Sequence, residues 1–154
     1  MKTRSLRLIA LGAVLTLGVA TASAVAGRSG PAAVATLKAR GTALGTILTD
    51  GRGMTLYLFE KDTRRKSACY GKCAAFWPPL MTSAKPHAGS GARASLIGTT
   101  RRTNGKLQVT YAGHPLYFFA EDKKAGDVKG QGFVHFGGAW WVVSSVGTKV
   151  TAKP

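Results

Sequence analysis

An internal duplication is the feature that most constrains how this 154-residue chain can fold. The pattern L-Y-x-F-x-x-D occurs at 56–62 and again 60 positions later, at 116–122. A Gly-Thr pair precedes each copy, and a tryptophan segment follows each, at Phe76-Trp77 and at Trp140-Trp141. A repeat of this size cannot bury its apolar face alone, so we expect two copies that stabilise each other. The defining positions are Leu56, Tyr57, Phe59 and Asp62 in the first copy, and Leu116, Tyr117, Phe119 and Asp122 in the second.

The local pattern of the chain is mostly that of β-strands. In the first repeat, a turn-rich tetrad at 50–53 separates two strand-like segments, 46–49 and 55–59. In the second repeat, the corresponding turn at 112–115 separates 107–111 from 116–119. Asn104-Gly105 is a hairpin signal between 96–102 and 106–111, and 139–145 is aromatic and β-branched. A helical pattern is found at 67–76, where Pro78-Pro79 ends it. The sequence predicts a mainly β fold: a small antiparallel β-domain made of two tandem repeats, with one short helix around the cysteine pair.

Within the motif, strand alternation places Tyr57 and Phe59 on one face and Leu56 and Leu58 on the other. Core packing is the favoured interpretation, with Asp62 and the equivalent aspartate of the second copy closing an Asx turn at the strand end. The alternative is a pair of aromatic platforms that bind a flat or cyclic ligand.

The amino-terminal 24 residues have the pattern of a secretory signal peptide. A basic start is followed by an uncharged stretch at 8–20 and by Ala22-Ser23-Ala24, a small-x-small cleavage pattern. The uncharged stretch is too short to cross a bilayer, which takes about 20 residues, and no other transmembrane segment is expected. We therefore predict export by the general secretory route to the periplasm or the cell exterior.

The rest of the chain divides by composition. We predict a flexible leader at 25–42, a duplicated β-domain at 43–146 and a frayed tail at 147–154. Inside the domain, repeat one is expected at about 43–81 and repeat two at about 95–146. The linker at 82–94 is rich in Gly, Ser, Ala and Pro and offers little to bury.

The two cysteines, Cys69 and Cys73, allow one intramolecular pairing. A structural disulfide is expected in an oxidising compartment, and the i, i+4 spacing puts the Cα atoms about 6 Å apart. Because the closed loop is short, the entropic model gives a stabilisation of only about 2 kcal/mol. The pair could instead act in redox chemistry or hold a soft metal. Haem attachment is disfavoured, because Ala74 stands where the axial histidine would follow.

The histidines and the wider motif search predict no enzyme. His87, His114 and His135 form no H-x-x-x-H or H-E-x-x-H pair, and no nucleophile elbow, phosphate loop or dinucleotide fingerprint occurs. His114 could ligate a metal together with Met54 if the repeat brings the two turns together; otherwise it is an exposed turn residue. We expect no catalytic residues, no metal and no cofactor.

Positive charge is the remaining signal. The chain has 22 Lys and Arg against 6 Asp and Glu, and loss of the signal peptide removes three bases, which lowers the formal net charge from +16 to +13. Such a field attracts anionic polymers. Outside the cytoplasm these would be envelope phospholipid or anionic glycans, whereas no motif predicts specific nucleic-acid recognition. The candidate anion-binding residues are Arg64, Arg65, Lys66, Arg101, Arg102, Lys123 and Lys124.

At these motifs the chain resembles a group of bacterial secreted-repeat proteins, the predicted lipoproteins with a Y-x-(F/W/Y)-x-x-D motif. The resemblance covers about 43–146 and includes both motif copies, the C-Y-G-K-C-A-A-F-W-P-P-L block at 69–80, G-H-P at 113–115 and G-G-A-W at 137–140. It implies an exported bacterial protein and brings no established activity. The cleavage point of this chain lacks the cysteine that would carry a lipid.

Taken together, the residues and the resemblance predict an exported, non-enzymatic binding or interaction protein of the bacterial envelope with a strongly basic surface. The alternative is an extracytoplasmic redox or soft-metal-handling protein that uses the Cys-x3-Cys pair.

Overall fold

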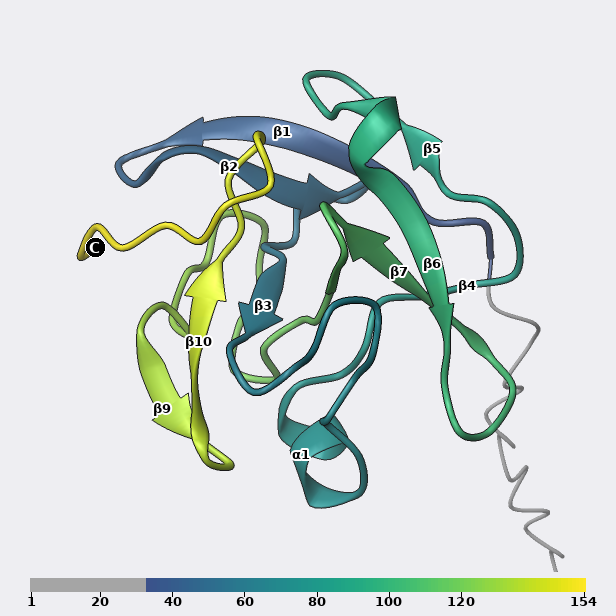
Figure 1. Cartoon of the computed structure of the whole chain (residues 1–154). Coiled ribbons are helices and arrows are strands. Elements are labelled where there is room, and N and C mark those ends of the chain that lie inside the picture. Colours follow the sequence, from purple (N-terminus) through teal and green to yellow (C-terminus); the bar gives the residue numbers. More distant parts are fainter. Residues whose placement is uncertain (1–32) are drawn as a thin grey trace, which may run out of the picture.

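The computed structural model describes residues 33–154 (Figure 1). The predicted signal peptide at 1–24 and the first part of the predicted leader, 25–32, lie outside the described residues. In chain order the elements are β1 (Thr36–Thr42), β2 (Gly45–Asp50), β3 (Tyr57–Phe59), α1 (Lys72–Phe76), β4 (Met81–Thr82), β5 (His87–Ala88), a 3-10 turn (Ala94–Leu96), β6 (Ile97–Arg101), β7 (Leu107–Tyr111), β8 (His114–Pro115), β9 (Phe133–His135) and β10 (Gly138–Val142).

The strands form three small sheets. Their orders are β2-β1-β5, β3-β10-β9 and β4-β7-β6, with β8 added to β7. Neighbouring strands are antiparallel, except for the short parallel pairing of β1 with β5. The predicted fold class is confirmed: a mainly β chain built from small antiparallel sheets, with one short helix beside the cysteine pair.

The two repeats are interleaved. The β1–β2 hairpin of the first repeat corresponds to the β6–β7 hairpin of the second, yet β3 pairs with β10 and β4 pairs with β7, so strands cross between the repeats. Matching backbone hydrogen bonds occur on both sides of this exchange. They are Leu80 N to Leu116 O (2.9 Å) and Val109 N to Leu80 O (2.8 Å), and their counterparts Val143 N to Leu56 O (3.1 Å) and Leu48 N to Val143 O (2.7 Å).

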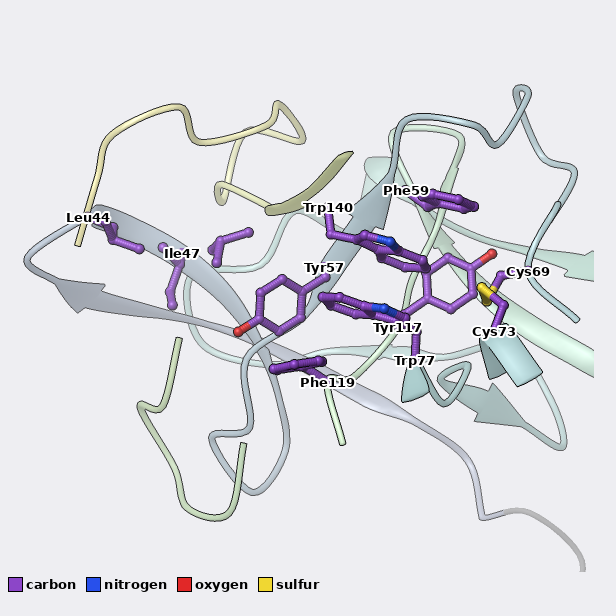
Figure 2. Close-up of a cluster of buried hydrophobic side chains, with 11 residues drawn as sticks. Leu44, Ile47, Tyr57, Phe59, Cys69, Cys73, Trp77, Tyr117, Phe119 and Trp140 are labelled. Atoms are coloured by element: carbon purple, nitrogen blue, oxygen red, sulfur yellow. A yellow bond between two sulfur atoms is a disulfide. The ribbon is translucent and has the colours of Figure 1, made fainter. Parts of the chain in front are cut away.

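A column of four stacked aromatic rings fills the centre of the molecule (Figure 2). The two tryptophans stack nearly parallel, with ring centroids 3.9 Å apart and an interplanar angle of 3°. A motif phenylalanine caps each tryptophan of the other repeat, Phe59 on Trp140 at 4.0 Å and Phe119 on Trp77 at 4.4 Å. All four side chains are buried, so each repeat supplies one half of a column that neither could close alone.

Strand alternation sorts the motif side chains into two cores. Phe59 belongs to the aromatic column and Tyr57 packs edge-on against it, whereas Leu56 and Leu58 point to a second cluster that also contains Leu116. This is the predicted separation of the two motif faces. Both faces are covered, because residues of the β1–β2 hairpin and of the second repeat pack together in each of the two clusters.

The amino-terminal part of the fold differs from the expectation. The leader was predicted to extend to residue 42, but β1 begins at Thr36 and pairs with β2 from Leu37 to Thr42. Leu37 is fully buried and anchors β1. The other residues of β1 are small or charged, so the sequence gives little indication of a strand there. The expected hairpin of 46–49 with 55–59 is also modified, because β3 leaves β2 after the Thr49–Thr55 bridge and joins β10.

Three further boundaries shift for physical reasons. The linker at 82–94 contains β5, which uses backbone hydrogen bonds to join β1 and therefore needs no apolar side chains. The helix is confined to α1, because residues 67–71 serve as hydrogen-bonding loop around the cysteine pair. The tail is tied back, since Val150 N donates to Val142 O at 2.9 Å and Gln131 donates to the carbonyls of Val150 and Ala152.

The column predicts a large stability cost for losing a central ring. Trp77→Ala should lower the free energy of unfolding by about 3–5 kcal/mol, because it removes a fully buried ring from between two others. Trp141→Ala is the matched control, since Trp141 is half-buried and lies outside the column. Urea unfolding of both variants measures the difference, and equal losses would contradict the central role of the column.

Candidate functional site

The two motif tyrosines meet at the centre of the duplication. Tyr57 N donates to Tyr117 O at 2.8 Å, and Tyr117 N donates to Tyr57 O at 3.0 Å. The phenols then cross to the opposite repeat: Tyr57 donates its hydroxyl to Asp122 Oδ2 at 2.6 Å, and Tyr117 donates to Asp62 Oδ2 at 2.8 Å. The tyrosine of each motif is therefore held by the aspartate of the other.

The second oxygen of each motif aspartate fixes the loop that follows it. Asp62 Oδ1 accepts from Ala68 N at 2.7 Å, and Asp122 Oδ1 accepts from Lys129 N at 3.0 Å. The predicted Asx turns are therefore wrong, because the backbone donors lie several residues beyond the strand end. Each carboxylate instead closes a longer loop and is held between that loop and the partner tyrosine.

Burial dominates the electrostatics of this centre. It raises the pKa of Asp62 to about 6, although the hydrogen bonds from Ala68 and Tyr117 and the charge of Arg102 oppose the rise. Burial also raises the pKa of Asp122 and, with the neighbouring carboxylates, the pKa of both phenols above the usual range. The tyrosines are neutral donors, and each needs its carboxylate as an acceptor.

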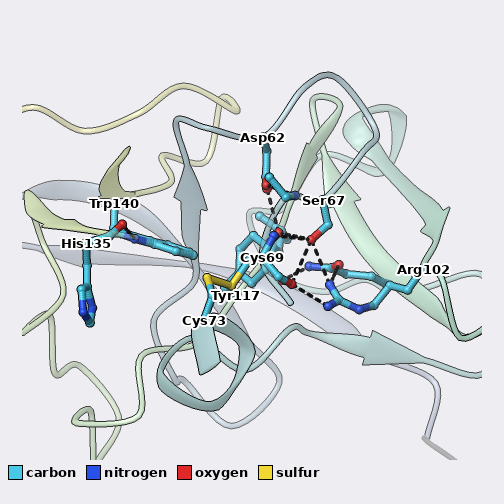
Figure 3. Close-up of a disulfide and its surroundings, with 11 residues drawn as sticks. Asp62, Ser67, Cys69, Cys73, Arg102, Tyr117, His135 and Trp140 are labelled. Atoms are coloured by element: carbon cyan, nitrogen blue, oxygen red, sulfur yellow. Dashed lines mark hydrogen bonds between the residues drawn. A yellow bond between two sulfur atoms is a disulfide. The ribbon is translucent and has the colours of Figure 1, made fainter. Parts of the chain in front are cut away.

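The cysteine pair is a disulfide, as predicted, with Cα atoms 5.2 Å apart (Figure 3). Cys69 is fully buried and Cys73 is 6% exposed, beside the tryptophan column. Because both sulfurs are oxidised and enclosed, they are not the accessible thiolates that soft-metal binding or thiol exchange requires. Among residues 33–154, no group of three or more His, Cys, Asp and Glu side chains could hold a metal ion.

Arg102 supports the disulfide loop from inside the protein (Figure 3). Its guanidinium donates to Cys69 O at 2.6 Å, to Gln108 Oε1 at 2.6 Å and to Ser67 Oγ at 3.0 Å. The same Ser67 hydroxyl lies 2.7 Å from the Tyr117 hydroxyl, so the network reaches the motif centre. Arg102 was predicted to bind anions at the surface; it is only 6% exposed, and this prediction is wrong.

Apart from Arg101, the remaining candidate basic residues separate into two surfaces. Arg64, Arg65, Lys66 and Arg101 are all exposed, and the loop that carries the first three is held against the second repeat. Arg65 N donates to Gly113 O at 2.8 Å, and the Thr100 hydroxyl, one residue from Arg101, donates to Arg65 O. Thr100 and Arg102 both direct their side chains to this loop, so strand alternation places the Arg101 side chain on the other face of β6. We call Arg64, Arg65 and Lys66 the basic face. A cavity of about 220 Å³ opens beside it, lined by Arg64, Arg65, Ser95, Leu96, Ile97, Gly98, Thr110, Ala112 and Gly113.

Lys123 and Lys124 form the other surface, in the loop after the second motif. Their backbone N–H groups both donate to Asp127 Oδ2, at 2.9 and 3.2 Å. The same carboxylate lies 3.9 Å from Lys129. This loop therefore carries a carboxylate among its lysines and is less positive than the basic face.

His114, which was considered as a metal ligand together with Met54, lines a cavity to which Met54 does not contribute. The cavity has a volume of about 420 Å³, and Glu60, Asp62 and Lys149 also line it. Burial and the nearby charge of Arg64 lower the pKa of His114, which favours its neutral form. Sequence reasoning did not find this cavity, because its walls come from both repeats and from the tail.

The comparison with protein families identifies the fold as a known type of repeat. The sequence profile of a family described as a secreted repeat of unknown function matches twice, at 38–81 and 98–144, which is more than half of the chain. The chain belongs to this family. The two matches coincide with the two interleaved repeats, and the resemblance predicted from the motifs is confirmed.

Two other comparisons gave no match, one with curated proteins and one with solved structures. Of the helices in the described part of the chain, none is long and apolar enough to cross a membrane. The family supports a secreted protein and does not distinguish the periplasm from the cell exterior.

The raised pKa of Asp62 predicts a pH dependence of stability. Between about pH 4 and about pH 6 the folded protein retains a proton on Asp62 that the unfolded chain has lost, so the contribution of this group to stability falls as pH rises. The advantage of the wild type over Asp62→Asn should therefore shrink from about pH 4 to about pH 7 in urea unfolding. A constant difference across this range would contradict the assignment.

The adjacent arginines 101 and 102 provide a matched test of the buried network. Arg102→Met should lower the free energy of unfolding by about 3 kcal/mol, because it leaves Cys69 O, Gln108 and Ser67 without their donor. Arg101→Met should change it by less than about 0.5 kcal/mol, since Arg101 is exposed. Chemical unfolding with the disulfide intact measures both, and an equally mild effect at position 102 would refute the structural role.

Proposed function

We propose that this protein is an exported, non-enzymatic binding protein of the bacterial envelope that captures anionic phospholipid or glycan surfaces through its basic face. The observation that carries the proposal is the grouping of Arg64, Arg65 and Lys66, exposed on one loop that hydrogen bonds hold against the second repeat. Guanidinium groups suit phosphate, sulfate and carboxylate ligands, because they donate in a planar fork.

The charge balance of the chain supports this proposal. All six acids of the sequence lie within the described residues, and five of them already accept hydrogen bonds. The ion pairs between described residues engage only Arg52, Lys129 and Lys149. The positive field of the other exposed bases is therefore left largely uncompensated and available to an anionic surface.

The cavity beside the basic face supports a ligand of the same chemistry. Arg64 and Arg65 line it together with the hydroxyl-bearing residues Ser95 and Thr110. A volume of about 220 Å³ suits a single anionic group, such as a headgroup phosphate or one acidic sugar substituent, better than a drug-sized ligand. Capture of a repeating anionic surface, one group at a time, fits this size.

A pair of double variants tests the basic face. Arg64→Ser with Arg65→Ser should weaken binding to phosphatidylglycerol vesicles or to heparin about tenfold or more. Lys123→Ser with Lys124→Ser removes the same charge from the other surface and should have a clearly smaller effect. Sedimentation and affinity chromatography measure binding, which should decline steeply with added salt. The proposal would be contradicted if the two double variants lost the same amount of binding affinity, or if added salt left binding unchanged.

A further inference from the structure

Helix α1 and the β9–β10 hairpin leave aromatic side chains uncovered at one end of the molecule. Phe76 is 47% exposed, Phe133 is 45% exposed and Val134 is 75% exposed. The half-buried rings of His135 and Phe136 join them, with centroids 5.4 and 6.0 Å from that of Phe76. We call these five residues the aromatic tip. The four rings are contiguous, whereas Val134, between Phe133 and His135 on β9, faces the other side of the hairpin by strand alternation. Exposed apolar groups gathered at one end of a protein mark interaction surfaces.

The aromatic tip is anchored to the core. Phe133 packs against Trp77 and Phe119 at centroid distances of 6.4 and 5.8 Å, so it extends the buried column to the surface. Phe133 also pairs with Trp140 across β9 and β10. The exposed rings are therefore held in place before any partner arrives, and binding them costs little conformational entropy.

Basic side chains lie beside the aromatic tip, together with one exposed carboxylate: Glu121 follows Ala120, whose N–H donates to Phe76 O at 2.9 Å. The segment at 130–148 contains no charged residue, whereas Lys72 stands exposed on α1 and Lys61 lies against Gly137 at the hairpin turn. The β6–β7 hairpin, with Arg101 at the end of β6, extends toward the same end of the molecule in Figure 1. Glu60, which follows β3 beside β10, already forms an ion pair with Lys149.

We propose that the aromatic tip enters the boundary between headgroups and acyl chains of a bilayer that contains anionic phospholipid. This inference rests on the proposed function and assigns its envelope partner to lipid. Lysine and arginine side chains would contact the anionic headgroups, while Phe76, Phe133 and Val134 would leave water for the apolar layer. The combination of basic rim and apolar centre is complementary to such a membrane in both charge and polarity.

The composition of the tip favours lipid over the other occupants. Acyl chains need no hydrogen bonds, and His135 is the only member of the tip with a polar side chain. Its Nδ1 is enclosed without a partner and so offers little to a hydroxylated sugar. A second copy of the chain would bring its own lysines against those around the tip, and like charges oppose that contact.

Two variants of equal charge test the inference. Val134→Asp places a carboxylate in the aromatic tip, whereas Val146→Asp places one on an exposed valine beyond the opposite end of β10. The first should weaken binding to mixed phosphatidylglycerol–phosphatidylcholine vesicles about tenfold more than the second. Val134→Leu should keep full binding, and near-UV circular dichroism should show that all three variants retain the packed column.

The outcomes separate the two proposals. Equal vesicle binding by Val134→Asp and Val146→Asp would overturn membrane entry and leave capture by the basic face intact. Wild-type binding to heparin without binding to vesicles would overturn the lipid assignment in favour of a glycan. A loss of self-association in Val134→Asp, with vesicle binding unchanged, would assign the tip to a second copy. Failure of the wild type to bind either probe would instead refute the proposed function itself.

Discussion

The crossed pairing of two tyrosines with two aspartates is the interaction on which the rest of the structure depends. Each buried phenol must find an acceptor, and each buried carboxylate must find donors, because neither can be left unpaired inside the protein. In this fold the carboxylate that accepts from each phenol comes from the other repeat: Asp122 for Tyr57 and Asp62 for Tyr117. A repeat on its own would bury a phenol without its carboxylate, so the duplication is a requirement for folding.

The surfaces of the protein follow from that centre. Crossing of the motifs brings the tryptophan of one repeat onto that of the other, and the column then reaches the surface at Phe133. The same crossing presses the loop after the first motif against the second repeat, where Arg65 is held by Gly113. One constraint in the core therefore positions both the basic face and the aromatic tip.

Sequence reasoning could predict the elements whose signal is carried by side chains. The duplication, the β6–β7 hairpin and the disulfide were predictable, because Asn-Gly turns, aromatic alternation and cysteine spacing report local chemistry. β1 and β5 were missed, because backbone hydrogen bonds hold them and their side chains are mostly small or charged. Arg102 was misassigned for a related reason: an Arg-Arg pair does not reveal that one member is exposed and the other is enclosed by the fold.

Separation of the repeats tests the central claim most directly. A protease site introduced at exposed Ala84, in the linker, would allow the folded protein to be cut and its two halves to be isolated under denaturing conditions. We predict that neither half alone shows a cooperative thermal transition or a near-UV signal from packed tryptophan. Mixing the halves should restore both signals, since each supplies what the other must bury. Cooperative unfolding of either isolated half would contradict the account.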